Sequence, residues 1–203
     1  TTSTFPAAAN ALPNVGYMRA LSPEGVLSVE PELIISDEGA GPPEALAVLK
    51  AAGIPFVEVP DTYDANGISE KILIVGKALG VEAKARELVD TVEAELSAAR
   101  NAVLSKTGET KRVLFILSTA NGRIMASGTN TAADGIINMA GGTNAIDAFE
   151  GYKPLTDEAI STAAPEVILM MDRGDHSSNA DELFAMPSMA TTPAAETRSL
   201  VKM

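Results

Sequence analysis

A tyrosine and an arginine stand two residues apart near the start of the chain, at Tyr17 and Arg19. A phenolate oxygen binds metal ions, and a fixed cation close to a phenol favours its ionised form. The pair is therefore a candidate metal-binding site. The alternative is ordinary packing, in which a tyrosine lies half-buried with its hydroxyl in water. Tyr63 and Tyr152 are rival phenols, and Tyr63 is the stronger rival because it follows a predicted strand.

The sequence holds no convincing catalytic motif. A Ser-His-Asp triad would have to use His176, the only histidine, with Asp172 or Asp175 beside it, but no Gly-x-Ser-x-Gly segment occurs. Cysteine is absent, so thiol chemistry and cysteine metal sites are excluded, and a zinc site would have a single imidazole. The sequence therefore favours a binding protein over an enzyme.

The residues after Tyr17 predict a short helix and then a buried strand. Ser22 is a suitable N-cap, and Pro23 takes the first helical position of a helix expected over 22–29. The apolar run 33–35 predicts the strand. We therefore expect Tyr17 on a loop that leads into a helix.

Strands and helices alternate along the chain, which predicts an α/β fold with parallel strands. A helix over 44–52 precedes a second strand over 54–59, and later strands are expected over 112–118 and 167–171. Between these pairs, apolar residues recur every three or four positions over 81–105. A helix of this length spans roughly 35–40 Å. It either bridges two lobes or covers the surface of a single domain.

Composition limits the partners. The chain has 203 residues, of which 46% are hydrophobic, and its net charge is −12. A strongly acidic chain argues against a nucleic-acid partner or an anionic membrane surface, because both attract basic patches. No apolar run is long enough to insert into a bilayer, and no signal peptide is visible at Thr1.

Six short segments follow one another in an order that resembles the haem-binding substrate proteins of bacterial ABC importers. They are Tyr17-Met-Arg-Ala-Leu-Ser-Pro-Glu-Gly, Glu30-Pro-Glu-Leu-Ile-Ile, Gly41-Pro-Pro-Glu-Ala-Leu, Ser127-Gly-Thr-Asn-Thr-Ala-Ala-Asp, Ala140-Gly-Gly-Thr-Asn-Ala and Pro165-Glu-Val-Ile-Leu-Met. The resemblance implies two Rossmann-like lobes with parallel sheets, bridged by one long α-helix. The lobes would be residues 1–80 and 107–203, with the bridging helix over 81–106. The family's usual first and last elements would lie outside this chain.

The resemblance also implies a site. Tyr17 would be the axial ligand of haem iron, which accepts a tyrosine oxygen, and Arg19 would support the phenolate. Arg123, Arg173 and His176 are candidates for a second ligand or for contacts with the haem propionates.

Acidic residues at helix starts are candidates for docking to the permease of the importer. Glu44 matches the family's first docking position, and Glu182 or its neighbour Asp181 is the guess for the second. The alternative for each is an ordinary carboxylate at the start of a helix.

The interpretation favoured by these observations is a periplasmic or lipid-tethered protein that captures haem between its lobes and delivers it to an ABC importer. Its signal peptide would not be part of this chain. The alternatives are binding of cobalamin or a ferric siderophore, or a small cytosolic α/β enzyme or regulatory domain in which Tyr17 is merely packed.

Overall fold

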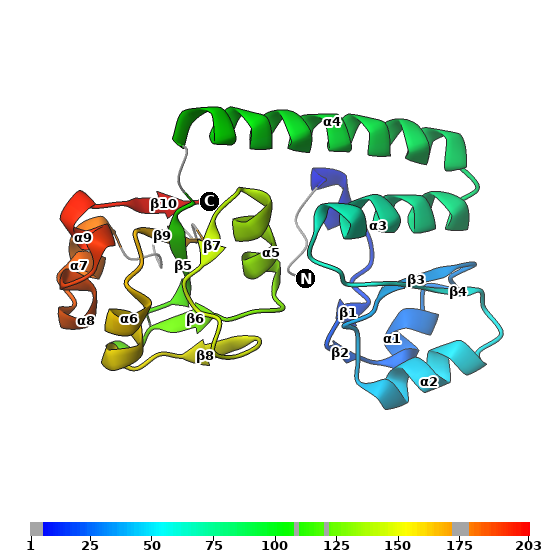
Figure 1. Ribbon diagram of the computed structural model, residues 1–203. Helices are drawn as coiled ribbons and strands as arrows, with labels where there is room; N and C mark the ends of the chain where they lie inside the picture. Colours follow the sequence, from blue (N-terminus) through cyan, green and yellow to red (C-terminus); the bar gives the residue numbers. More distant parts are fainter. Residues whose placement is uncertain (1–5, 108–109, 120–121, 172–178) are drawn as a thin grey trace. The chain divides into compact units, whose positions relative to one another are not determined.

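The computed structural model describes residues 6–107, 110–119, 122–171 and 179–203. The chain divides into two compact units (Figure 1). Unit 1 comprises Thr1–Thr62 and Asn66–Thr91, and unit 2 comprises Tyr63–Ala65 and Val92–Met203. Each unit is described below by itself.

Unit 1 is built from short elements. In chain order these are a 3-10 turn (Ala7–Ala11), β1 (Gly16–Tyr17), β2 (Ala20–Leu21), α1 (Pro23–Leu27), β3 (Ile34–Asp37), α2 (Pro43–Ala51), β4 (Phe56–Val59) and α3 (Ala65–Ala78). Strands β3 and β4 pair in parallel, with Ile34 opposite Phe56. The predicted strand–helix–strand unit is therefore confirmed.

A small apolar core holds these elements together. Its buried members are Val26 of α1, Ile34 of β3 and Leu49 of α2, and the partly buried side chains packed against them are those of Val15, Leu21, Leu27, Ile54 and Phe56. The predicted cap of α1 is present, because the Ser22 hydroxyl oxygen accepts a hydrogen bond from the Gly25 amide. Burial of these apolar side chains packs residues 15–27 against β3 and α2.

The segment around Tyr17 is a hairpin rather than the predicted loop. Strands β1 and β2 pair antiparallel, with Tyr17 opposite Ala20, so that Met18 and Arg19 are the two residues of the turn. Two-residue strands carry no apolar alternation, which is why the sequence pattern did not indicate them.

Helix α3 begins earlier than its sequence suggests. Asn66-Gly67 is typical of a turn, which favours a helix from about Ser69, but the structure places both residues inside α3. A Cβ atom added to Gly67 would lie 2.4 Å from the carbonyl oxygen of Thr62. This glycine therefore serves close packing of the helix on the preceding chain and not a turn.

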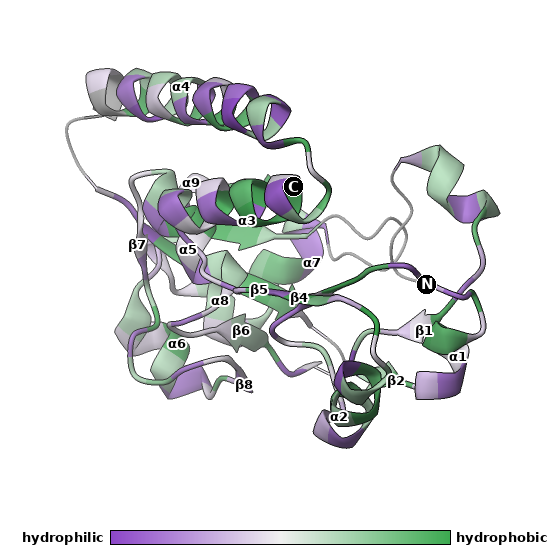
Figure 2. Cartoon of the chain, turned by 90° about the vertical axis from the view of Figure 1, so that its right-hand side faces the viewer, coloured by the Kyte–Doolittle hydropathy of each residue, from purple (hydrophilic) through white to green (hydrophobic). Residues whose placement is uncertain are grey.

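The predicted long helix is confirmed as α4 (Glu82–Thr107), which begins in unit 1 and ends in unit 2. Hydrophilic and hydrophobic residues alternate around it (Figure 2). Ala85 and Val89 are its buried apolar side chains. Gly76 of α3 lies so close to Ala85 that an added Cβ atom would be 2.2 Å from the Ala85 Cβ atom. The start of α4 is therefore packed tightly on α3.

Unit 2 contains a mixed sheet flanked by helices. Its elements are β5 (Arg112–Ser118), β6 (Met125–Ser127), α5 (Ala132–Met139), β7 (Thr143–Asn144), β8 (Tyr152–Pro154), α6 (Asp157–Ala163), β9 (Val167–Met170), α7 (Ala180–Phe184), α8 (Pro187–Ala190), α9 (Pro193–Thr197) and β10 (Leu200–Lys202). The strand order is β10-β9-β5-β6-β8, and β7 pairs with β5. Strands β5, β7, β9 and β10 are mutually parallel, whereas β6 and β8 are antiparallel to their neighbours.

Strand β5 is the centre of unit 2. Leu114 and Ile116 have no exposed surface and belong to the core that α6, α7, α8 and α9 help to cover. Phe115 points to the other face, where it packs with Ala133 and Ile137 of α5. The strands over 112–118 and 167–170 match the prediction, whereas β10 is a strand that the sequence analysis did not predict.

These observations confirm the predicted class: a mixed α/β fold with parallel strands in both units and one long helix. Within the part of the chain that the structure describes, no helix is both long and apolar enough to cross a membrane.

Candidate functional site

The Tyr17 hairpin presents three consecutive side chains to solvent. Tyr17 is 47% exposed and Met18 is 37% exposed, and Arg19 is exposed beside them. A strand residue and the two turn residues of a hairpin this short stand at its tip. The phenol, the thioether and the guanidinium are therefore within reach of a ligand that approaches the tip.

Local sequence explains why the chain turns here. Gly16 has a φ of +107°, a conformation that residues with a Cβ atom rarely adopt. The Gly16 amide donates a hydrogen bond of 3.0 Å to the side-chain oxygen of Asn14. The sequence Asn-Val-Gly therefore sets the direction in which Tyr17 leaves the core.

The two ends of the hairpin are anchored in the core of unit 1. Val15 precedes β1 and Leu21 ends β2, and both side chains pack against Val26, Ile34 and Leu49. The base of the hairpin is therefore held by apolar packing, while its tip carries the exposed groups. This arrangement can hold a ligand on a fixed side chain without a mobile loop.

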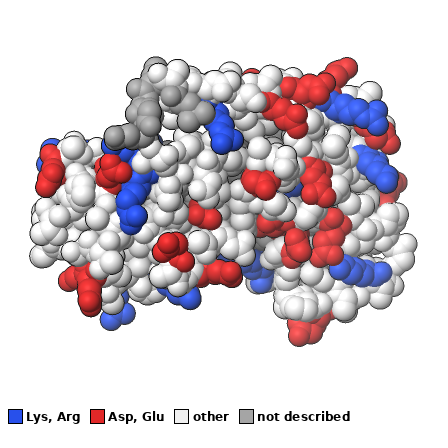
Figure 3. All heavy atoms as spheres, viewed as in Figure 1, with Lys and Arg blue, Asp and Glu red and all other residues white. Residues whose placement is uncertain are grey.

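Basic residues are rare in the part of the chain around Arg19. Arg19 and Lys50 are the only basic residues between Thr1 and Thr62, and Lys50 pairs with Glu58 at 2.9 Å. Among the described residues, the Arg19 guanidinium has no hydrogen bond or ion pair. Figure 3 shows many acidic side chains on the visible face of unit 1. The Arg19 guanidinium is thus a positive charge that no described side chain pairs with, two positions from Tyr17, in a unit with many acidic residues.

The nearest helix start carries a fixed negative charge. The Ser22 hydroxyl donates a 2.6 Å hydrogen bond to the Glu24 carboxylate, and this bond, together with a backbone hydrogen bond, lowers the pKa of Glu24. The Glu24 carboxylate is therefore engaged with the cap of α1 rather than with Arg19.

The other candidate ligands lie in unit 2 or outside the described residues. Arg123 follows β5 and is exposed, and it has no hydrogen-bond or ion-pair partner within the described ranges. Arg173 and His176 lie in 172–178, outside the described residues. The structure therefore brings Tyr17 and Arg19 together on one hairpin and leaves the second ligand a prediction.

The rival phenols have other surroundings. Tyr152 is 42% exposed in β8, and its ring meets that of Phe115 edge-on at a centroid distance of 6.4 Å. Tyr63 is partly buried, and its backbone lies against α5, where a Cβ atom added to Gly135 would be 2.0 Å from the Tyr63 carbonyl oxygen. Tyr17 thus stands at the tip of a hairpin, whereas each rival is packed against a neighbouring element.

The predicted docking acids differ in their partners. Glu44 is exposed in the first turn of α2 and has no hydrogen-bond or ion-pair partner among the residues described. The Glu182 carboxylate accepts a hydrogen bond from the Asn179 amide as part of a capping box, and Asp181 pairs with Arg198. Glu44 is therefore available to a partner, while Glu182 and Asp181 already stabilise unit 2.

Sequence reasoning missed a buried polar network in unit 2. The hydroxyl oxygens of Ser127 and Thr131 are 2.5 Å apart, and the Asn144 amide donates to the Gly128 carbonyl and to Asp134. Among the described residues, every buried side-chain nitrogen and oxygen atom has a hydrogen-bond partner. The signal was present as Thr131 followed three residues later by Asp134, which is typical of a helix start.

The described residues hold no group of three or more His, Cys, Asp or Glu side chains that could bind a metal ion.

Known proteins share both the sequence pattern and the fold. The sequence matches the family described as periplasmic binding protein over residues 1–203. The structure resembles that of BhuT, a periplasmic heme-binding protein in complex with two hemes, with a TM-score of 0.91 and 39% identity over 98% of this chain and 76% of that chain. It also resembles RhuT from Roseiflexus sp. RS-1, a periplasmic heme-binding protein in apo form, with a TM-score of 0.86 and 38% identity over 97% and 76% of the two chains.

A curated relative extends the comparison. YvrC of Bacillus subtilis (strain 168), an uncharacterized ABC transporter substrate-binding lipoprotein, is 27% identical over 174 residues, which are 85% of this chain and 55% of that protein. The chain thus spans about half the length of this relative. All three relatives are named as binding proteins, and the family match covers every residue. The chain therefore belongs to the periplasmic binding protein family.

Proposed function

We propose that this chain binds haem outside the cytoplasm, as the substrate-binding component of an ABC importer, and that Tyr17 supplies the axial ligand. The observation that carries the proposal is the exposed phenol of Tyr17 two residues from the Arg19 guanidinium, which has no hydrogen-bond or ion-pair partner among the described residues, on a hairpin anchored in the core. The names of BhuT and RhuT, at 39% and 38% identity, support haem as the ligand.

The chemistry of the hairpin suits ferric haem. Fe(III) is a hard ion that accepts an anionic oxygen, and a tyrosine is a known axial ligand of haem iron. Arg19 adds a positive charge two residues away, which favours the approach of the haem propionates. Met18 adds an apolar, polarisable surface next to the phenol, and such surfaces suit the face of a macrocycle.

The family match and the relative YvrC support the proposed partner and location. The relative YvrC is named an ABC transporter substrate-binding lipoprotein, which supports delivery to an ABC permease and a place outside the cytoplasm. Glu44, which is exposed and has no ion-pair partner in the part of the chain that the structure describes, is the acid we assign to the permease contact on unit 1. Glu182 is a weaker candidate on unit 2, because its carboxylate already caps α7.

The test is a hemin titration of the wild type and three Tyr→Phe variants, followed in the Soret region. Tyr17→Phe removes the phenol oxygen alone, and Tyr63→Phe and Tyr152→Phe are matched controls. We expect saturable binding that Tyr17→Phe weakens at least about tenfold, equal to about 1.4 kcal/mol, while the controls bind as the wild type does. Loss of binding in a control instead would move the ligand to that tyrosine. Absence of saturable binding by the folded wild type would exclude haem and direct the search to cobalamin and ferric siderophores.

A further inference from the structure

A single glycine joins the Tyr17 hairpin to the helix that carries Glu44. The Gly41 amide donates a 2.9 Å hydrogen bond to the Met18 carbonyl, and the Gly41 carbonyl accepts a 2.9 Å hydrogen bond from the Leu21 amide. These two bonds link Gly41 to the turn and to the second strand of the hairpin. Gly41 is buried, so both bonds are shielded from water.

The loop that carries Gly41 is itself fixed. The Asp37 carbonyl accepts from the Ala40 amide at 3.0 Å, and the Asp37 carboxylate accepts from the Gly39 amide at 2.9 Å. Glu38 ties the loop to β4, because its amide donates to the Val59 carbonyl at 2.9 Å. Movement of Gly41 relative to the sheet would therefore break several hydrogen bonds at once.

Apolar packing connects the same elements. Leu21 of β2 and Leu49 of α2 belong to one core, together with Ile34 of β3. Glu44 lies one turn from Gly41, and the amides of Ala45 and Leu46 donate to the Pro42 carbonyl at 3.0 and 3.2 Å. The hairpin, the loop and the first turn of α2 therefore form one continuous hydrogen-bonded element.

We propose that Gly41 is a positioning residue that couples Tyr17 to the start of α2, so that a ligand bound by Tyr17 and a cationic protein surface bound at Glu44 change each other's affinity. The proposal rests on the proposed function in that it takes hemin as the ligand of Tyr17. Coupling of this kind is reciprocal by linkage and typically amounts to a factor of about 5–150.

The chain offers a matched pair of variants. Gly41→Pro removes the amide hydrogen that the Met18 carbonyl accepts. Gly41→Ala keeps that hydrogen, and its Cβ atom would meet Pro43 at 3.9 Å, which is an ordinary contact. A difference between the two variants therefore reports on what proline changes, namely the lost amide hydrogen and the restricted backbone, and not on the loss of glycine.

The experiment is amide hydrogen exchange, read residue by residue with and without hemin. In the wild type and in Gly41→Ala we expect hemin to slow exchange at least about threefold at Gly41, Ala45 and Leu46. In Gly41→Pro we expect no slowing at Ala45 and Leu46 and a hemin Kd raised about tenfold. Slowing confined to the hairpin in a wild type that binds hemin would overturn the coupling, and this comparison needs no variant to fold.

A second comparison separates this proposal from the proposed function. Without ligand, the Leu21 amide should exchange at least about tenfold faster in Gly41→Pro than in Gly41→Ala. The reason is that residue 41 has then lost one of its two hydrogen bonds to the hairpin. A wild type that fails to bind hemin would refute the proposed function, and equal Leu21 exchange in the two folded variants would refute the coupling on its own. If Gly41→Pro does not fold, an unprotected Leu21 amide in the ligand-free wild type refutes the coupling instead.

Discussion

The side-chain amide of Asn144 donates a 3.0 Å hydrogen bond to the Asp134 carboxylate and a 3.1 Å bond to the Gly128 carbonyl. The Asn144 side-chain oxygen accepts from the Ile146 amide at 3.1 Å. One buried residue thus ties β7 to the start of α5 and to the turn after β6. The network lies in the segment Ser127-Gly-Thr-Asn-Thr, which is part of one of the motifs that carry the family resemblance.

Replacement of this residue should destabilise unit 2. Asn144→Ala leaves the Ile146 amide without its acceptor and the Gly128 carbonyl without its Asn144 donor, which should cost about 2–3 kcal/mol. The measurement is the opening free energy from hydrogen exchange at the Leu114 and Ile116 amides of β5. Asn138→Ala is the control, because Asn138 is exposed near the end of α5. Equal effects of the two variants would contradict a stabilising role for the network.

Close packing at Gly135 reverses the usual preference of helices for alanine. Glycine to alanine inside a helix normally gains up to about 1 kcal/mol. At this position the added Cβ atom would lie 2.0 Å from the Tyr63 carbonyl oxygen, so Gly135→Ala should instead lose about 1–3 kcal/mol. Calorimetric melting checks the sign, with Gly41→Ala as the control for an added methyl group. A rise in melting temperature for Gly135→Ala would show that Tyr63 does not approach α5 in this way.

The direction of Tyr17 depends on Gly16. Because Gly16 has a φ of +107°, Gly16→Ala strains the backbone by about 1–3 kcal/mol. We expect the strain to be relieved by distortion of the hairpin, with weaker hemin binding and little change at β5. The hemin titration and exchange at the β5 amides measure the two effects separately. Hemin binding by Gly16→Ala at the affinity of the wild type would contradict the role assigned to this turn.

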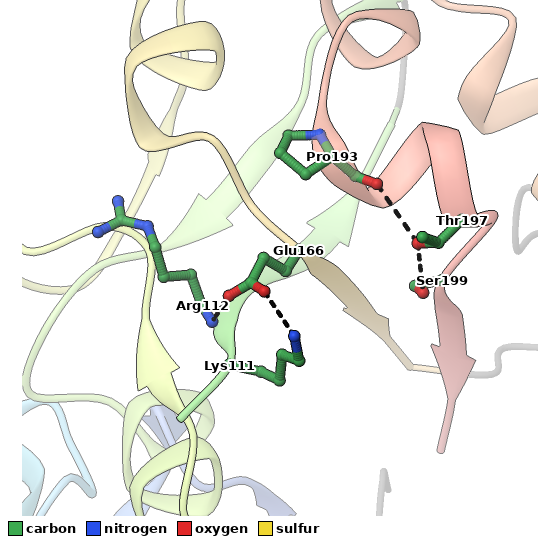
Figure 4. Close-up of polar contacts among 6 residues, drawn as sticks. All are labelled: Lys111, Arg112, Glu166, Pro193, Thr197 and Ser199. Carbon is green, nitrogen blue, oxygen red and sulfur yellow. Dashed lines mark hydrogen bonds and ion pairs between the residues drawn. The ribbon is translucent and has the colours of Figure 1, made fainter. Parts of the chain in front are cut away.

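One ion pair of unit 2 should respond to pH. The Lys111 ammonium donates to Glu166 at 2.7 Å and the Arg112 amide donates at 3.0 Å (Figure 4), and these hydrogen bonds, that from Lys111 first, lower the pKa of Glu166 from 4.5. Because the folded-state pKa is the lower one, the stabilisation is complete well above pH 4.5. It is lost as the pH falls through the folded-state pKa.

The variant Glu166→Gln tests this pH dependence. At neutral pH it should lower the opening free energy of β5 by no more than about 1 kcal/mol, since the pair is partly exposed. The difference from the wild type should vanish at acid pH. Glu95→Gln, on the exposed surface of α4, is the control. A difference that grows as the pH falls would mean that the sign of the pKa shift is wrong.

The long and strongly patterned elements could be predicted from the sequence. The Ser22 cap, the parallel pair of β3 and β4, and helix α4 were predicted because each rests on a local pattern of several residues. The two-residue strands β1, β2 and β7 are too short to carry such a pattern, since only their pairing with another strand defines them. The early start of α3 was missed because a glycine after an asparagine usually indicates a turn. Only the structure shows that Gly67 packs closely on Thr62 inside the helix.

The side chains of the candidate site could be predicted from the sequence, but the backbone hydrogen bonds that hold the hairpin could not. The types and spacing of Tyr17 and Arg19 pointed to the phenol, and the structure shows both residues exposed on one hairpin. The bonds at Gly41 join backbone atoms, so no residue type in the sequence indicates them. The Asn144 network was missed for a related reason, because its partners come together only when β7 pairs with β5.

Resonance Raman spectroscopy of the hemin complex tests the central claim most directly. With excitation in the phenolate-to-iron charge-transfer band, a coordinated tyrosinate gives enhanced ring modes that shift when ring-deuterated tyrosine is incorporated. We predict these modes in the wild type, in Tyr63→Phe and in Tyr152→Phe, and their loss in Tyr17→Phe. Tyrosinate modes that persist in Tyr17→Phe, or a wild-type hemin complex without them, would contradict the assignment of Tyr17 as the ligand.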